Sequence, residues 1–260
     1  MTDAALAPDR PTMLPRLYAG AAIVVLWELV VRGFAPSYVA TPFGIAMALP
    51  RVLADATFLK ATAITLGAVA EGLVIALAIG TVLGLLIGRS LVADRALRHY
   101  VNACYAVPMI VVLPLVSLWF GYTGAARLAT IVFAASFSIA VNVADGARAV
   151  PRDYLEVAHS FRSSEGRALF EIVLPASMPY FLAGLRLAAG RALIAAVVAE
   201  FFTAIPGLGY FILYNSRVFR HNDAFVAVLL LGGFGVGFDA LVNYATRRYL
   251  PWYRRADGDN

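Results

Sequence analysis

Six long runs of apolar residues dominate the chain, and short polar stretches separate them. A helix needs about 20 apolar residues to cross the hydrocarbon core of a bilayer, because every backbone group there must be hydrogen-bonded within the helix. The six runs cover residues 17–35, 61–88, 100–120, 126–145, 179–203 and 223–245. The pattern predicts an all-α integral membrane protein with about six transmembrane helices. Residues 17–251 form one membrane domain, between an N-terminal tail (1–16) and a C-terminal tail (252–260).

Prolines and glycines interrupt two of these runs. Pro108 and Pro114 fall within the third run and predict a kink there. Met109, beside that kink, lines a translocation path or packs in the core. Glu200 lies near the end of the fifth run, and three helix-breaking residues follow that run: Pro206, Gly207 and Gly209. They predict a bent loop that forms part of a gate, with an ordinary surface turn as the alternative.

A charged amphipathic stretch, residues 156–175, lies between the fourth and fifth runs. Its apolar positions, which begin just before it, fall mostly three or four residues apart: Tyr154, Leu155, Ala158, Phe161, Ala168, Leu169 and Ile172. Charged residues fill the positions between them, as in a helix that lies on a surface. We name residues 151–175 the coupling segment. A docking surface and a helix resting at the lipid headgroups are the two interpretations of this pattern.

The coupling segment also carries signals for helix ends. Asp153, with Glu156 three residues later, predicts a capping box that opens a short helix. Ser163 and Ser164 are candidates to cap a second helix. Pro175 is expected to end that helix at Leu174, and Pro179 suits the first turn of the next span. The expected structure is helix, turn, helix.

The composition is typical of a membrane protein, and it argues against disulfide, metal and ATP-binding chemistry in this chain. Hydrophobic residues make up 61% of the chain and charged residues 14%, outside the range of soluble globular domains. Cys104 is the single cysteine, and the three histidines have no metal-ligand spacing. The chain therefore offers no internal disulfide and no metal site. Lys60 is the only lysine and follows no glycine-rich loop, so a phosphate-binding loop for ATP is absent from the sequence.

Basic residues between the runs are distributed unequally. Thirteen arginines fall on the side that holds both termini and the coupling segment, and six basic residues fall on the other side. Because basic residues favour the cytoplasm, both termini and the coupling segment are predicted to be cytoplasmic. A cleavable signal peptide is the alternative for the N-terminus. Glu28 interrupts its apolar run, which favours a membrane helix that is retained.

Charged residues inside the predicted spans are expected to face protein or water. At 1.5 Å per residue, Glu71 lies about 15 Å inward from the outer end of the second span. Arg191 lies about 18 Å outward from the inner end of the fifth, so the two depths roughly agree. Our hypothesis is that the two residues pair, as a packing ion pair, or that Arg191 faces the path of an anion. Arg186 is expected to extend toward the cytoplasm.

Several motifs together resemble one family. Glu156-Val157-Ala158 followed by Leu174-Pro175 resembles the EAA loop of binding-protein-dependent ABC importer permeases. The motifs elsewhere resemble the nitrate, sulfonate and taurine branch: Thr41-Pro42, Ala106-Val107-Pro108, Leu113-Pro114, Trp119-Phe120-Gly121, Gly184-Leu185-Arg186, Ala199-Glu200 and Gly207-Leu208-Gly209. Their order and spacing cover residues 41–252.

The resemblance implies a type I ABC importer-like permease in a bacterial cytoplasmic membrane, importing a small solute such as a sulfonate, taurine or nitrate. It implies two copies of a cytoplasmic ATPase that binds ATP-Mg, a second permease copy in a homodimer, and an extracytoplasmic solute-binding protein. The chain itself would bind no cofactor and no nucleic acid. The ATPase-docking residues would be Glu156, Val157, Ala158, His159, Phe161, Arg162, Ser163 and Glu165. Those of the path or gate would be Glu71, Met109, Arg191, Glu200, Pro206, Gly207 and Gly209.

Two positions depart from the family pattern. The family usually has a glycine six residues after the EAA glutamate, where this chain has Arg162. A positive backbone torsion there is easy for glycine and costly for arginine. Relatives also tend to carry an arginine near the start of the second span, where this chain has Gly67-Ala68 and then Glu71. The role of that arginine does not transfer.

Functions from other classes make different predictions. A membrane enzyme needs a polar cluster at one depth, and the sequence offers no strong candidate. A secondary transporter or channel could show the same spans and buried charges, but it leaves the coupling segment unexplained. Uptake that requires ATP and a separate ATPase distinguishes the importer from these alternatives.

Overall fold

A computed structural model describes residues 13–34 and 39–249, and every regular element in these ranges is a helix. In chain order the helices are α1 Met13–Phe34, α2 Pro42–Leu53, α3 Ala56–Arg89, α4 Leu91–Ala106, α5 Met109–Phe120, α6 Gly124–Ala149, α7 Arg152–Ser160, α8 Glu165–Ala168, the π-helical turn η1 Leu169–Val173, α9 Leu174–Thr203, α10 Leu208–Arg217 and α11 His221–Tyr249. The predicted all-α fold is confirmed. The C-terminal tail and most of the N-terminal tail lie outside the described residues.

Five stretches of helix are long and apolar enough to cross a membrane: α1, α3, α6, α8 through α9, and α11. A sixth span exists only if α4 and α5 are counted together, and these two helices meet at an angle of 103°. The predicted bend at Pro108 is confirmed, but it separates two helices instead of kinking a single helix. Pro108 has no N–H group and holds Val107 in an extended conformation, so the helix ends there. Pro114, in contrast, lies inside α5.

The centre of the molecule is the packing of α6 between α3 and α9. Gly80 and Gly84 of α3 face α6 so closely that a Cβ atom would lie within 2.7 Å of Ile139 and 2.6 Å of Val143, respectively. On the other side, α9 presents buried alanines, among them Ala192 and Ala195. Small residues let helix backbones approach one another, which is how membrane helices associate.

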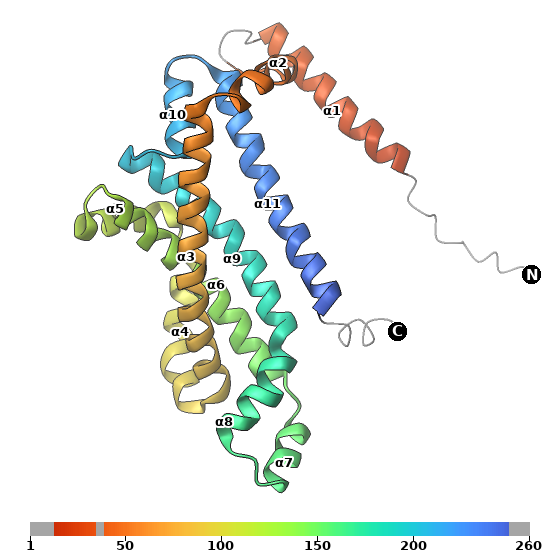
Figure 1. Cartoon of the computed structure of the whole chain (residues 1–260), viewed down its shortest axis with the longest axis vertical. Coiled ribbons are helices and arrows are strands. Elements are labelled where there is room, and N and C mark those ends of the chain that lie inside the picture. The colour runs from red at the N-terminus through yellow and green to blue at the C-terminus, as the bar shows by residue number, and fades with distance from the viewer. Residues whose placement is uncertain (1–12, 35–38, 250–260) are drawn as a thin grey trace, which may run out of the picture.

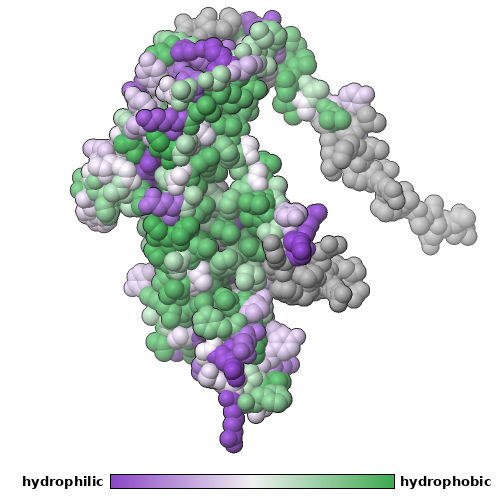
Figure 2. All heavy atoms as spheres, viewed as in Figure 1, coloured by the Kyte–Doolittle hydropathy of each residue, from purple (hydrophilic) through white to green (hydrophobic). Residues whose placement is uncertain are grey.

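The long helices run between two ends of the molecule, and different short helices lie at each end (Figure 1). Helices α2 and α10 lie at one end, and α7 and α8 lie at the opposite end. In Figure 2 apolar residues cover the middle of the bundle, while hydrophilic residues gather at its ends. Helix α1 is angled away from the bundle and meets it at α2, where the Phe43 N–H donates to the Glu28 carboxylate over 2.9 Å. The end that carries α7 is thus separated from α2 and α10 by the length of the bundle.

Candidate functional site

Helix α7 of the coupling segment has one face packed and one face free. Leu155 packs against the cluster formed by the ends of α6 and η1, and Ala158 is buried. Beside this packed face, Tyr154 and Val157 of α7 and its C-cap Phe161 are all exposed, with Phe161 at 83%. These three residues are spaced as i, i+3 and i+7 and form an apolar ridge at the tip of the molecule. A ridge with this spacing suits insertion into a groove on another protein.

The turn after α7 is a Schellman motif, a common way to end a helix. The Ser163 N–H donates to the Ala158 carbonyl over 2.9 Å, and the Arg162 N–H donates to the His159 carbonyl over 2.8 Å. This pattern requires a left-handed residue at the position of Arg162, which has a φ of 53°. The family's glycine position thus keeps its positive torsion, and arginine bears the steric cost expected for it.

Two helix caps were predicted in the coupling segment, of which one is confirmed and the other is wrong. Ser164 caps α8, because its hydroxyl accepts the Arg167 N–H over 3.3 Å. The capping box of Asp153 and Glu156 is wrong, since α7 begins two residues earlier than it requires and its N-cap is Pro151, which makes no side-chain cap hydrogen bond. Asp153 lies in the first turn of α7 instead, where its charge is favourable next to the helix N-terminus.

Pro175 does not end the second helix, contrary to the prediction. The chain continues from α8 through η1 into α9, which includes Pro175 in its first turn and Pro179 in its interior. The N–H of Leu174 donates to the Leu169 carbonyl five residues earlier, as in a π-helical turn. This wider turn lets the helix continue through a residue that lacks an N–H group. The coupling segment is therefore connected to the membrane helix α9 without a loop.

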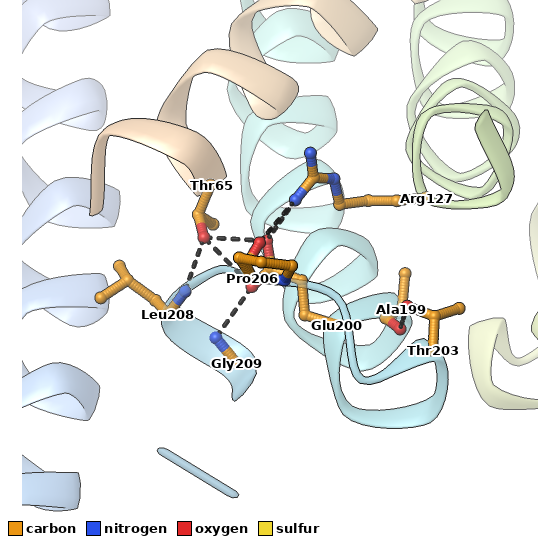
Figure 3. A network of polar contacts seen from close by, with 8 residues as sticks. All are labelled: Thr65, Arg127, Ala199, Glu200, Thr203, Pro206, Leu208 and Gly209. Carbon is orange, nitrogen blue, oxygen red and sulfur yellow. Dashed lines mark hydrogen bonds and ion pairs between the residues drawn. The ribbon is translucent and has the colours of Figure 1, made fainter. Parts of the chain in front are cut away.

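At the opposite end of the molecule, the carboxylate of Glu200 is the centre of a polar network (Figure 3). Glu200 is fully buried. Its oxygens accept hydrogen bonds from the Thr65 hydroxyl over 2.8 and 3.0 Å, from Arg127 Nη1 over 3.0 Å and from the Gly209 N–H over 2.8 Å. These donors belong to α3, α6 and α10, so one side chain of α9 joins three other helices.

The same network fixes the loop between α9 and α10. Arg127 Nη1 also donates to the Pro206 carbonyl over 3.2 Å, and the Leu208 N–H donates to the Thr65 hydroxyl over 2.8 Å. A Cβ atom on Gly207 would lie 2.1 Å from the Glu200 carboxyl carbon, so only glycine fits there. The predicted helix break is confirmed, since α9 ends at Thr203 and α10 begins at Leu208.

Two members of this network were not predicted as site residues. In the sequence, Arg127 was only one of the six basic residues on the side opposite the termini, and Thr65 had no predicted role. Arg127 lies 73 residues before Glu200 and Thr65 lies 135 residues before it, so no local spacing could connect them. The signal available in the sequence was that a carboxylate within an apolar run needs donors.

Arg191 does not pair with Glu71, which corrects that hypothesis. Its Nη1 donates to the Tyr105 carbonyl over 2.9 Å, and its guanidinium lies 3.8 Å from the centre of the Tyr105 ring. Glu71 is exposed on α3 because its neighbour Gly72 faces α6. Within residues 13–34 and 39–249 no ion pair joins Glu71 and Arg191. Of the predicted path residues, the structure brings together Arg191 and Met109, which line one cavity.

Arg186, which was expected to extend toward the cytoplasm, joins α9 to α11. Its Nε lies 2.7 Å from the Asp239 carboxylate. Asn243 donates to that same carboxylate over 2.9 Å. Among the described residues, no group of three or more His, Cys, Asp or Glu side chains is arranged to hold a metal ion.

Comparison with known proteins adds information about the whole chain. Residues 76–251 match the sequence profile of a family described as "binding-protein-dependent transport system inner membrane component". The chain is 28% identical to the formylaminopyrimidine transport permease protein ThiX of Halalkalibacterium halodurans, over 90% of this chain and 93% of that protein. It is 32% identical to the nitrate import permease protein NrtB of Leptolyngbya laminosa, over 73% of this chain and 68% of that protein. Among solved structures, the MetNI methionine ABC transporter in an inward-facing conformation matches with a TM-score of 0.64 at 17% identity, over 74% of this chain and 95% of that chain.

Proposed function

The chain belongs to the family of binding-protein-dependent transport system inner membrane components, and from that premise we propose that it imports a small solute, driven through its coupling segment by a separate ATPase. As a permease subunit it is non-catalytic. In the proposed cycle a soluble binding protein delivers the solute on the outer side, and ATP-driven closure of the ATPase moves the membrane helices. ATP-Mg is bound only by the ATPase.

The apolar ridge on α7 is the observation that carries this proposal. Tyr154, Val157 and Phe161 are exposed at one end of the bundle, and the Schellman turn holds the last of them in place. An exposed apolar surface rimmed by charged residues is typical of an interaction site. Helix α8 continues through η1 into α9 without a loop, so a force on the ridge passes through the turn after α7 to a membrane helix.

The proposed assembly contains two permease chains and two ATPases, with both termini of each permease in the cytoplasm. The arginine distribution supports this orientation, since it places the ridge on the ATPase side. One chain with five or six spans offers too few helices to enclose a path alone, which supports a homodimer. The mass of the detergent-purified complex tests this stoichiometry, and a single permease per complex contradicts it.

At the other end, we assign the loop between α9 and α10 to an outer gate. Non-helical backbone at a membrane boundary is stable only against protein or a water-filled cavity, and this loop is held against three helices by Glu200. Because Glu200 is fully buried, its role in the gate is to hold the loop rather than to touch the solute.

The ridge can be tested by truncating its most exposed side chain. We expect Phe161→Ala to weaken binding of the ATPase subunit by at least about tenfold, because a large apolar anchor is removed from the contact. ATP-dependent uptake in proteoliposomes should fall in parallel. Both quantities are measured on the purified permease, with added ATPase and binding protein for uptake.

Tyr122→Ala provides the matched control, since it truncates an aromatic residue that is 70% exposed but lies between α5 and α6. This variant should bind the ATPase normally. If Phe161→Ala also binds it normally, the ridge is not the docking surface. Transport by the permease alone, driven by an ion gradient, would instead identify a secondary transporter or channel.

A further inference from the structure

The break between α4 and α5 borders a cavity of about 260 Å³ in the middle part of the bundle. Residues from the end of α4 and the start of α5 form one side of it, and α6 and α9 form the other. Phe133 and Ile194 give it apolar walls, while Arg191 projects from α9. A cavity of this size is smaller than the usual site for a drug-sized ligand and suits a small solute.

Arg191 is held in this cavity by the helix break itself. Because α4 ends at Ala106, the Tyr105 carbonyl lacks the N–H donor that a continuing helix would provide. Arg191 supplies one N–H to that carbonyl and stacks on the Tyr105 ring. A guanidinium carries five N–H donors, and this contact uses one of them. The others remain to bind a ligand.

The charge in the cavity is not neutralised by the chain. Among the described residues that line it, Arg191 is the only one with a charged side chain. The neighbouring arginines in or near the membrane have carboxylate partners: Arg127 with Glu200, Arg148 with Asp94, and Arg186 with Asp239. Arg191 has no ion pair within residues 13–34 and 39–249. A cation inside a membrane protein is costly and marks a path or a site for an ion.

The start of α5 adds a second positive contribution. Pro108 is its N-cap and makes no side-chain cap hydrogen bond, so the first N–H groups of this 12-residue helix have no side-chain acceptor there. Pro108 and Met109 both line the cavity. A helix N-terminus favours negative charge. Its field therefore adds to that of the Arg191 guanidinium.

We propose that this cavity is a binding site for a small oxyanion on its way through the permease, held by Arg191. The inference rests on the proposed import function and names its substrate class. A guanidinium binds two oxygens of an oxyanion side by side, which a lysine cannot do. The two relatives differ in what they are named for, a formylaminopyrimidine and nitrate. Because no carboxylate neutralises Arg191, an anion is favoured over a formylaminopyrimidine as the substrate of this chain.

Cys104 allows a direct test, because it lines the same cavity and is the only cysteine in the chain. The purified full-length protein is treated with two thiol reagents of similar size: the anionic sulfonatoethyl methanethiosulfonate and the cationic trimethylammonioethyl methanethiosulfonate. Intact-protein mass spectrometry gives the two rates, and each is divided by the rate of the same reagent with a small free thiol, because a thiolate reacts intrinsically faster with the cationic reagent. We expect the anionic reagent to react roughly tenfold faster, because a positive site concentrates anions, and sodium nitrate to slow it.

Variants of Arg191 separate charge from geometry. Arg191→Gln should abolish both the anion preference and the protection by nitrate, whereas Arg191→Lys should keep the preference and lose most of the protection. Arg89→Gln removes one positive charge at the end of α3 and should change neither. Equal rates in the unmodified protein, a preference for the cation, or no reaction at Cys104 would each overturn the proposal.

Uptake by the complete importer distinguishes this inference from the proposed function. With ATPase and binding protein present, Arg191→Gln should lose uptake of the anion while it still binds the ATPase. If the anion preference at Cys104 holds but no ATPase binds, the importer proposal fails and the site remains. If a working importer shows no anion preference at Cys104, the site fails and the importer remains.

Discussion

Glu200 shows how a charged side chain is accommodated inside this membrane protein. A buried carboxylate is costly unless donors surround it, and here Thr65, Arg127 and the Gly209 N–H provide them. The carboxylate also lies at the N-terminus of α10, where negative charge is favourable. Gly207 and Gly209 leave room for it. Loop conformation and charge burial therefore depend on each other.

Gly207→Ala should destabilise the protein through this network. The new methyl group would overlap the Glu200 carboxyl group, so the carboxylate or the loop must move and the contact with Arg127 is lost. Breaking a buried ion pair costs about 3 kcal/mol. For a protein of this size that corresponds to a fall of roughly 6–12 °C in the apparent unfolding temperature, measured by differential scanning fluorimetry.

Gly232→Ala is the control for this substitution, since a Cβ atom there would have no neighbour within 4 Å. It should leave the unfolding temperature unchanged or raise it slightly, because alanine favours helix more than glycine does. An unaltered unfolding temperature in Gly207→Ala would show that the loop does not depend on the network.

Arg162 bears steric cost in the turn of the coupling segment. A left-handed backbone costs a non-glycine residue about 1–2 kcal/mol, so Arg162→Gly should stabilise the turn by about 1 kcal/mol. That corresponds to roughly fivefold slower hydrogen exchange at the Ser163 N–H, which donates across the turn. Hydrogen exchange read by mass spectrometry on the segment measures the change.

The matched comparison is Arg167→Gly, which makes the same exchange of side chains within α8. It should speed up hydrogen exchange, because glycine weakens a helix. Exchange that becomes faster in both variants would contradict the account of the turn.

At the level of elements, η1 determines how the coupling segment is oriented on α9. A π-helical turn holds one more residue than an α-helical turn and changes the direction of the side chains that precede it. Pro175 favours this wider turn because it has no N–H to offer to the Glu171 carbonyl. The proline predicted as a helix end is thus a residue that sets the angle of the ridge.

Pro175→Ala should remove this effect. The alanine N–H can complete an α-helical turn, and the coupling segment would then rotate by about 100° relative to α9. Distances between spin labels at Phe161→Cys and Leu187→Cys, in a Cys104→Ser background, should change by several ångströms, and ATP-dependent uptake should fall. Pro179→Ala, in the regular part of α9, should leave the distance unchanged. If the distance is unchanged in Pro175→Ala, then Pro175 is not the cause of the π-helical turn η1.

The elements that sequence reasoning predicted well are those determined by local pattern. The apolar runs predicted both ends of α6 and the C-terminal ends of α3 and α9 within a few residues. They did not predict where α3 and α9 begin. In the run over 100–120, Pro108 predicted a bend, but the sequence does not show that this bend reaches 103° and separates two helices. The spacing of apolar residues predicted that α7 is a surface helix, but not which of these residues stay exposed as the ridge. The π-helical turn was not, because it depends on how Pro175 is accommodated in three dimensions.

At the scale of the whole molecule, the least predictable feature is which residue each charged side chain contacts. Arg191 was matched with Glu71 by depth, but depth does not say which way a side chain points around its helix. The sequence places Glu71 beside Gly72, and only the packing of α3 on α6 turns Glu71 outward. The Glu200 network has the same origin, since its members meet only when the four helices α3, α6, α9 and α10 are assembled.

The order of synthesis gives this network a further consequence. Arg127 is made 73 residues before Glu200, and at roughly 5–20 residues per second the ribosome adds the carboxylate about 4–15 seconds later. During that interval the newly inserted helices α3 and α6 hold a guanidinium without its acid. A charged group without its partner is costly inside a membrane, so we expect the addition of Glu200 to stabilise the arrangement of these helices.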